Sequence, residues 1–232
     1  MSAGRTARER VRAELTREIT DIARRQLAVD GAAGLSLRAV AREMGMVSSA
    51  IYRYFPSRDD LLTALIIDGY NALGEAVENA EAACAPGDHT GRWLAVCHAV
   101  RDWALAHPHE YALLYGSPVP GYKAPVDTVT AAIRDTVVYG RIVSDAHRAG
   151  VLNPPDLCPP VPASFGRDAE RVRGLMPGVP DEVVARALTA WTGLFGWVGF
   201  ELFGQFNNTI LDPAPAFEHA MRCHAALLGL PA

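Results

Sequence analysis

The sequence SSAIYRYF, which begins at Ser48, combines small hydroxyl residues with tyrosines and a cation at helical spacing. In an α-helix its isoleucine and phenylalanine, four residues apart, lie on one face and can pack inward. The residues left on the other faces are Ser48, Ser49, Tyr52 and Arg53. Small residues let a helix end enter the DNA major groove, hydroxyls bond phosphates or base edges, and arginine can donate two hydrogen bonds to guanine. The pattern is typical of a DNA-binding helix, and also of an ordinary helical hairpin with a solvated polar face.

The preceding segment, SLRAVAREM, predicts a helix that begins at Ser36, whose hydroxyl can accept backbone N–H groups at a helix start. Its apolar side consists of Leu37, Val40, Ala41 and Met44. Gly45 ends this helix, because glycine adopts the left-handed conformation that closes many helices. The next helix begins at Val47 or Ser48 and ends before Pro56. Two helices joined by so short a turn predict a helix-turn-helix.

The segment GLSLRAVAREMGMVSSAIYRYFPSRDDLLTALI resembles the DNA-binding domain of the tetracycline-repressor (TetR) family of bacterial transcription regulators. The features that carry the resemblance are a serine that opens the first of the two helices, a turn built on glycine and an apolar residue, and an aromatic-rich end to the second helix. A basic residue and an acidic pair then open a long helix. The chain departs from the family pattern at Val47, usually a capping residue, and at Ser49, often Gly or Pro, so the start of the second helix can shift by one residue.

The resemblance implies a role in DNA binding for nine residues of this segment. Those expected to hold phosphates are Ser36, Tyr52, Tyr54 and Arg58. Those expected to approach base edges are Arg38, Ser48, Ser49 and Arg53, with Ala50 in apolar contact with a thymine methyl group. Four arginines near the N-terminus either reach phosphates or form a solvated face with the neighbouring glutamates; they are Arg5, Arg8, Arg10 and Arg12.

Charge is divided unevenly along the chain of 232 residues, whose formal net charge is −4. Residues 1–60 hold 11 Arg and 8 acidic residues, a balance of +3, and the remainder holds 11 cations and 18 acids, a balance of −7. A basic N-terminal module attached to an acidic remainder suits a protein that touches DNA at one end. The N-terminus is too charged for a signal peptide, and the apolar stretch 191–206 is too short to span a membrane. The sequence therefore predicts a soluble, cytoplasmic protein with no membrane association.

The periodicity of apolar residues predicts an all-α protein. We expect residues 1–58 to form a three-helix helix-turn-helix domain, joined by a long helix over 58–83 to a larger regulatory domain over 84–232 that binds ligand and dimerises. Residues 151–180 contain seven prolines and predict an irregular connection. The phrases EYALLYGSPVPGY and AWTGLFGWVGFELFG are similar to TetR-type C-terminal domains. That resemblance implies a homodimer in which the last two long helices pair across a twofold axis, so that the two DNA-binding helices can enter successive major grooves.

Aromatic residues of the regulatory domain are candidates for an apolar ligand pocket, with core packing or the dimer interface as the alternative. The pocket residues that we expect are Trp103, Tyr111, Tyr115, Trp191 and Phe195. Cysteine and histidine spacing matches no metal motif, and Gly193, Gly196 and Gly199 lie within a predicted helix, so they are no dinucleotide fingerprint. We expect no metal, no cofactor, no catalytic residues and no enzyme activity.

The pattern as a whole predicts a homodimeric repressor that binds a palindromic operator in double-stranded DNA and is released by a small apolar or aromatic effector. One alternative is a helical small-molecule carrier or enzyme whose DNA-binding module is vestigial. Another is a pure interaction scaffold with no ligand pocket.

Overall fold

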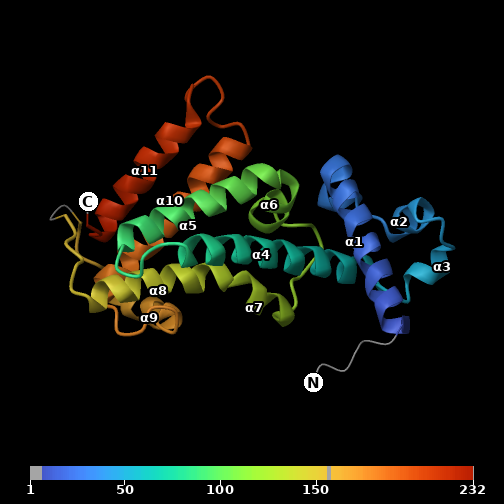
Figure 1. Ribbon diagram of the computed structural model, residues 1–232, viewed down its shortest axis with the longest axis horizontal. Helices are drawn as coiled ribbons and strands as arrows, with labels where there is room; N and C mark the ends of the chain where they lie inside the picture. Colours follow the sequence, from blue (N-terminus) through green and yellow to red (C-terminus); the bar gives the residue numbers. More distant parts are fainter. Residues whose placement is uncertain (1–6, 156–157, 232) are drawn as a thin grey trace. The chain divides into compact units, whose positions relative to one another are not determined.

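The computed structural model describes residues 7–155 and 158–231, and these form helices and connecting segments with no strand (Figure 1). The chain divides into two compact units. The first comprises residues 1–70 and 107–131, and the second comprises residues 71–106 and 132–232. The helix α4 (Arg58–Ala82) runs through the boundary after Tyr70 without a break and so contributes to both units.

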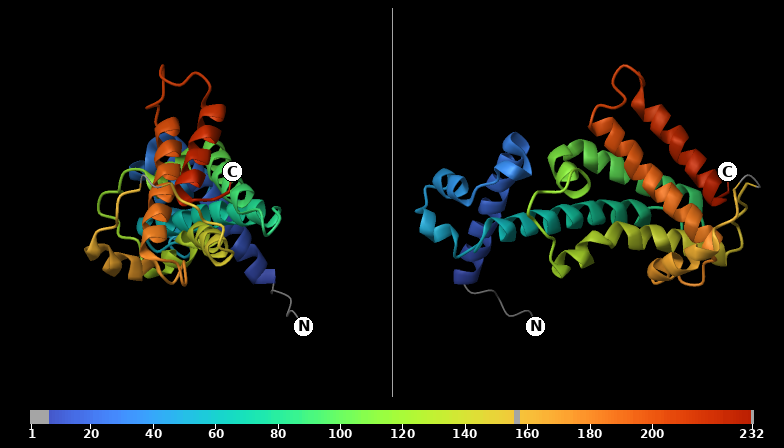
Figure 2. Two further views of the ribbon diagram at one scale, coloured as in Figure 1. Left: turned by 90° about the vertical axis from the view of Figure 1, so that its left-hand side faces the viewer. Right: turned by 180° about the vertical axis from the view of Figure 1, so that it is seen from behind.

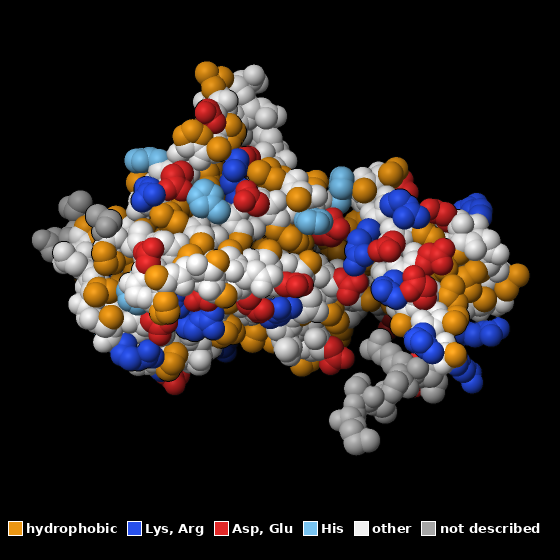
Figure 3. Space-filling view, viewed as in Figure 1, with side chains coloured by type: hydrophobic (Ala, Val, Ile, Leu, Met, Phe, Trp, Pro, Cys, Tyr) orange, Lys and Arg blue, Asp and Glu red, His pale blue; other side chains and the backbone are white. Residues whose placement is uncertain are grey.

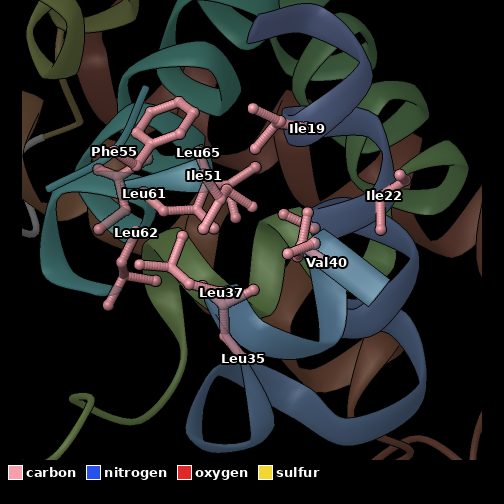
Figure 4. Packing of buried hydrophobic residues seen from close by; sticks show 13 residues of the cluster. Ile19, Ile22, Leu35, Leu37, Val40, Ile51, Phe55, Leu61, Leu62 and Leu65 are labelled. Atoms are coloured by element: carbon pink, nitrogen blue, oxygen red, sulfur yellow. The ribbon is translucent and has the colours of Figure 1, made fainter. Parts of the chain in front are cut away.

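The first unit is built on α1 (Ala7–Gly34), α2 (Leu37–Glu43), α3 (Ser48–Ile51) and the first half of α4. Their apolar side chains converge on one buried cluster, shown in Figure 4. Its members are Ile19, Ile22, Ala23, Leu35, Leu37, Val40, Ala41, Ile51, Phe55, Leu61, Leu62, Leu65 and Ile66. Because complete burial of one Leu, Ile or Phe side chain stabilises a fold by roughly 1.5–3 kcal/mol, this cluster holds the short helices α2 and α3 in place.

The segment after residue 106 returns to this first unit, which the sequence analysis did not foresee. It contains α6 (Pro108–Tyr115), the 3₁₀-helix η1 (Val126–Thr128) and α7 (Val129–Ala132). Leu113, Leu114 and Val119 pack against the buried cluster, and the Tyr122 hydroxyl lies 2.9 Å from the Thr63 hydroxyl. The expected second domain, residues 84–232, is therefore interrupted by a segment that packs partly buried apolar side chains against the helix-turn-helix.

The second unit contains the end of α4 with α5 (His89–Ala106), α8 (Arg134–Arg148), η2 (Ala163–Phe165), α9 (Gly166–Val172), α10 (Asp181–Leu202) and α11 (Pro213–Leu228). The long helices α10 and α11 lie side by side (Figures 1 and 2). The proline-rich connection expected over 151–180 includes the two short helices η2 and α9, so it is more ordered than the sequence predicted.

Helix α10 is, among the described residues, the one helix long and apolar enough to cross a membrane by length and composition. The same composition is typical of a core or interface helix in a soluble protein. Val183, Val184, Ala187, Leu194 and Val198 are buried within the unit. Glu201 near its end accepts a hydrogen bond of 2.8 Å from Arg101 Nε. The packed face and this ion pair favour a role in the helical core.

Candidate nucleic-acid interface

Helix α2 begins and ends where its sequence predicts. The Ser36 hydroxyl accepts a hydrogen bond of 3.4 Å from the Ala39 backbone N–H, in the position of an N-cap. At the other end Gly45 has φ of +67°, and the following Met46 N–H donates to the Ala41 carbonyl over 2.8 Å. The predicted cap and the predicted glycine turn are both confirmed. The turn sets α3 against α2.

Helix α3 begins at Ser48, the later of the two expected positions, and is shorter than expected. Regular α-helix ends at Ile51, and the chain then tightens, because the backbone N–H groups of Arg53 and Tyr54 donate three residues back, to Ala50 and Ile51, over 3.2 and 2.9 Å. Phe55 resumes the four-residue spacing with a bond of 3.1 Å to Ile51. One helical turn followed by a tighter turn therefore carries the candidate DNA-binding side chains.

The inner and outer faces of α3 divide as the four-residue spacing predicts. Ile51 and Phe55 are buried, with exposed fractions of 0% and 7%, whereas Tyr52 is 42% exposed. The other exposed candidates are Arg38, Ser48, Ser49 and Arg53, and the half-buried ones are Ser36, Ala50 and Tyr54. The outer face thus consists of hydroxyl, aromatic and cationic side chains.

Several arginines of this surface have no acidic partner. In Figure 3 arginine side chains (blue) project from the surface of the helices α1 to α3. Arg25 pairs with Glu43, and Arg24 with Asp21 and Asp68. No ion pair formed by the described residues includes the exposed arginines Arg38, Arg42 and Arg53. Unpaired cations on one face attract phosphate and keep their donors available for it.

Arg12, an exposed residue of α1, supports the end of α3. Its Nη2 donates to the Arg53 carbonyl over 2.9 Å, and its guanidinium carbon lies 5.3 Å from the centroid of the Tyr54 ring. A cation at the last carbonyls of a helical segment satisfies groups that lack a helical partner. The sequence analysis missed this role, because no local pattern connects residues 41 positions apart. Arg5, which it considered together with Arg12, lies outside the described residues.

Arg58 makes contacts that compete with the phosphate contact implied by the resemblance. Its Nη2 donates to the Ala32 carbonyl over 2.6 Å and its Nε to the Leu35 carbonyl over 3.2 Å. Ala32 lies in the last turn of α1 and Leu35 directly follows the helix, where a cation is favoured by the helix dipole. The guanidinium thereby ties the start of α4 to the end of α1. These bonds occupy two of the Arg58 donors, and its expected phosphate contact stays a prediction.

Both units resemble known regulators. Residues 19–65 match the family described as bacterial regulatory proteins, tetR family, and residues 93–224 match the tetracyclin repressor-like C-terminal domain. The HTH-type transcriptional regulators Rv1816 of Mycobacterium tuberculosis (strain ATCC 25618 / H37Rv) and Mb1846 of Mycobacterium bovis (strain ATCC BAA-935 / AF2122/97) are each 40% identical to the chain over 226 residues, which are 97% of this chain and 94% of each relative. The chain belongs to the TetR family. It is a transcriptional regulator with a helix-turn-helix DNA-binding domain.

Solved structures agree with this assignment. The crystal structure of SCO4313, a proposed regulatory protein, superposes with a TM-score of 0.76 at 37% identity, covering 94% of this chain and 98% of the other. A Rhodococcus sp. RHA1 protein of unknown function superposes with a TM-score of 0.67 at 29% identity, covering 92% and 93%. The match to the bacterial regulatory proteins, tetR family, falls mostly in the basic residues 1–60, and the C-terminal match lies in the acidic remainder.

The aromatic residues expected to line one ligand pocket of this TetR regulator are divided between its units. Tyr111 and Tyr115, with ring centroids 5.1 Å apart, belong to the first unit. Trp191 and Phe195, 5.0 Å apart, belong to the second, as does the buried Trp103. The five residues therefore do not line a common cavity within either unit. In the first unit a pocket of about 340 Å³ is formed by the end of α1, by α6 and by residues 117–120.

The second unit of the TetR regulator contains a small internal cavity that does include two of the expected residues. It is lined by Trp93, Val96, Val100, Asp135, Tyr139, Trp191, Leu194 and Phe195. Its volume is about 10 Å³, so in this structure the lining side chains close on one another. No group of three or more His, Cys, Asp or Glu side chains that could hold a metal ion occurs among the described residues.

Proposed function

We propose that this TetR-family regulator is a ligand-responsive repressor that acts in the cytoplasm and binds a palindromic operator as a homodimer. The observation that supports it most directly is the face of α3: hydroxyl, aromatic and cationic side chains lie outward over the buried Ile51 and Phe55. A short helix with small residues at its N-terminal end can enter a major groove deeply, and unpaired arginines beside it supply donors for bases and phosphates.

The proposed DNA contacts follow from the type of each residue and from the exposure of its side chain. Arg38, Arg53, Ser48 and Ser49 approach base edges, and Ala50 contacts a thymine methyl group. Tyr52 and Tyr54 hold phosphates, with Ser36 close to the backbone while its hydroxyl caps α2. Arg58 is left out of this set because its Nη2 and Nε already donate to the carbonyls of Ala32 and Leu35.

The test uses an operator fragment from the region upstream of the gene in a fluorescence-anisotropy titration. Arg38→Ala is expected to cost about 1–3 kcal/mol against the best sequence and to relax base preference at one position of each half-site. Arg148→Ala, which changes an exposed arginine of the second unit, is the matched control and should leave affinity unchanged. If Arg38→Ala weakened every DNA sequence equally, its proposed base contact would be wrong.

The proposed dimer uses α10 and α11, and an exposed, uncharged strip of α10 supports it. Thr189, Thr192, Gly196 and Phe200 are exposed at spacings of three and four residues. A Cβ atom at Gly193 would meet the His224 ring of α11, whereas at Gly196 it would meet nothing within 4 Å. A glycine lowers the stability of a helix, and no close packing within the chain requires a glycine at position 196. Close approach of a second copy would require one.

Gly196→Arg is therefore expected to abolish dimer formation without unfolding the chain. An added Cβ atom meets nothing within 4 Å in its own subunit, position 196 is exposed, and replacing glycine in a helix should raise stability by about 0.5–1 kcal/mol. Sedimentation equilibrium measures the oligomer, and thermal unfolding checks the fold. Gly174→Arg is the control, since Gly174 is exposed and also has nothing within 4 Å of an added Cβ. A dimer that survived Gly196→Arg would place the interface elsewhere.

Two other classes of function predict different results. A carrier or enzyme with a vestigial DNA-binding module would not shift its own upstream region in a gel. A scaffold would show no ligand-induced change in melting temperature. For the repressor, an effector must favour the released state over the DNA-bound state by a few kcal/mol. This requires the effector to bind the released state about a hundredfold or more tightly than the DNA-bound state.

A further inference from the structure

The internal cavity of the second unit combines one carboxylate with four aromatic rings. Its lining residues come from α5, α8 and α10, and Asp135 is the only charged residue among them. Asp135 is 6% exposed, and Trp93 and Tyr139 are 0% and 2% exposed. Burying a carboxylate removes its hydration, which is costly unless another charge or a set of donors replaces the water. The groups that replace the lost hydration of Asp135 therefore indicate the function of this site.

The compensation that the chain itself provides is limited to neutral donors. The Thr136 hydroxyl donates to Asp135 Oδ1 over 3.2 Å, and Asp135 lies in the first turn of α8, where helix N–H groups favour an anion. The neighbouring cation, Arg134, is bound to Glu78 over 2.7 and 2.9 Å. No ion pair formed by the described residues includes Asp135, and burial raises the pKa of its carboxyl group. The buried carboxyl group of Asp135 therefore has no cationic partner among the described residues.

The rings around Asp135 offer the cavity apolar and π surface. Trp93 Nε1 donates to the Met221 carbonyl over 2.9 Å, and the Tyr139 hydroxyl donates to the Ala187 carbonyl over 2.8 Å. Trp191 Nε1 is buried and has no hydrogen-bond partner. Aromatic faces attract cations, most strongly where water is excluded. An acidic group surrounded by tryptophan, tyrosine and phenylalanine rings is the chemistry that recognises substituted ammonium ions.

We propose that this cavity is the effector site and that its ligand is a small organic cation of the substituted-ammonium class, with the charge beside Asp135 and the substituents against Trp93, Tyr139, Trp191 and Phe195. The inference names the effector class for the ligand response proposed above and rests on it. Trp191 and Phe195 are the half-buried members of the lining, so the ligand enters past them and opens the closed cavity. An anion is excluded because it would meet the Asp135 carboxylate.

The experiment compares two probes of nearly identical shape, benzyltrimethylammonium and its uncharged carbon isostere neopentylbenzene, by quenching of tryptophan fluorescence in the full-length protein. The cation is expected to bind at least about tenfold more tightly than the isostere. Asp135→Asn removes the charge but keeps the size, so it should erase that preference by weakening the cation alone. Asp168→Asn, at an exposed aspartate of the same unit, should leave both affinities unchanged. Equal binding of the two probes, or an unaltered cation affinity in Asp135→Asn, overturns the proposal.

The unliganded Asp135→Asn variant provides a second measurement that does not need a ligand. Since burial raises the pKa of Asp135 above its usual 3.8, the charged form disfavours folding, and stability is lost as the pH rises from 3.8 through the folded-state pKa. Tyr139, the other titratable residue of the lining, has a pKa raised well above 10 and stays neutral in this range. Asp135→Asn should therefore melt at a higher temperature than wild type at pH 7, with the difference vanishing below pH 4. A purely structural helix cap would give the opposite sign, and that result would overturn the proposal.

Operator binding separates this inference from the proposed function. If benzyltrimethylammonium binds with the expected dependence on Asp135 and also weakens operator binding by the wild-type protein, both proposals are supported. If it binds with that dependence but operator affinity does not change, the cation site stands and its role as the effector site fails. If operator DNA is not bound at all, the proposed repressor fails, whereas the probe titrations still decide the cation site.

Discussion

Arg92→Ala is expected to lower the free energy of unfolding by about 3–5 kcal/mol, because it leaves a buried carboxylate without its partner. The Arg92 side chain is 5% exposed and that of Glu81 is 9% exposed, and they approach to 2.6 Å. Arg92 also bonds Asp145 over 3.0 Å and the Pro86 carbonyl over 3.0 Å, so its donors join α4, α5 and α8. Because both charges are buried, removing one partner leaves the other buried charge uncompensated.

A neighbouring arginine, Arg141, limits the size of this effect. Arg141 stays 2.6 Å from Glu81 after the substitution and partly compensates its charge, so the loss should lie near about 3 kcal/mol. The compensation is incomplete because Arg141 is 50% exposed and solvent screens it. Arg148→Ala is the control: its side chain is 70% exposed and reaches Asp145 over 3.0 Å, and its removal should cost less than about 1 kcal/mol. Urea denaturation followed by circular dichroism measures both. If the two variants lost equal stability, burial would not be the cause.

The helix-turn-helix was predictable because its determinants are local. The Ser36 cap, the Gly45 turn and the split between Ile51 and its exposed neighbours each depend on residues within four positions of one another. Local rules did not set the length of α3. Without a capping side chain at Val47, and with bonds that tighten after Ala50, regular helix spans one turn only.

Contacts between distant parts of the chain account for the differences. No spacing rule connects Arg12 with the Arg53 carbonyl or Arg58 with the carbonyls of α1. The same holds for α6, whose leucines look equally suited to either unit until their packing partners are known. The aromatic residues expected to form one pocket were chosen by residue type alone, and their division between the units followed from chain topology.

Asp135 was missed although a sequence signal was present. Along α8 the buried positions recur at three and four residues, and Val138, Tyr139 and Ile142 continue the series that Asp135 opens. A carboxylate on the apolar face of an amphipathic helix is unusual, because its burial must be compensated. Such a residue indicates either a helix cap or a ligand site, and only the surrounding rings distinguish the two.

Ile51→Ala tests whether burial beneath α3 positions the DNA-binding face. Ile51 is 0% exposed within the cluster of Figure 4, and truncation of such a side chain costs about 2–5 kcal/mol through lost contacts and the remaining cavity. Helix α3 is short and its outer face is solvated, so it can sink toward the cavity, which favours the lower half of that range. Unfolding in urea measures the loss.

Operator binding distinguishes lost stability from lost geometry. At a temperature where Ile51→Ala is still folded by circular dichroism, affinity should fall, because a shift of α3 moves Arg53 and Tyr52 away from the groove while their chemistry is unchanged. Val47→Ala, whose side chain is 71% exposed, is the control and should alter stability by no more than about 0.5 kcal/mol. A folded Ile51→Ala protein with wild-type affinity would mean that the position of α3 is set by the DNA, and that the buried cluster supplies stability alone.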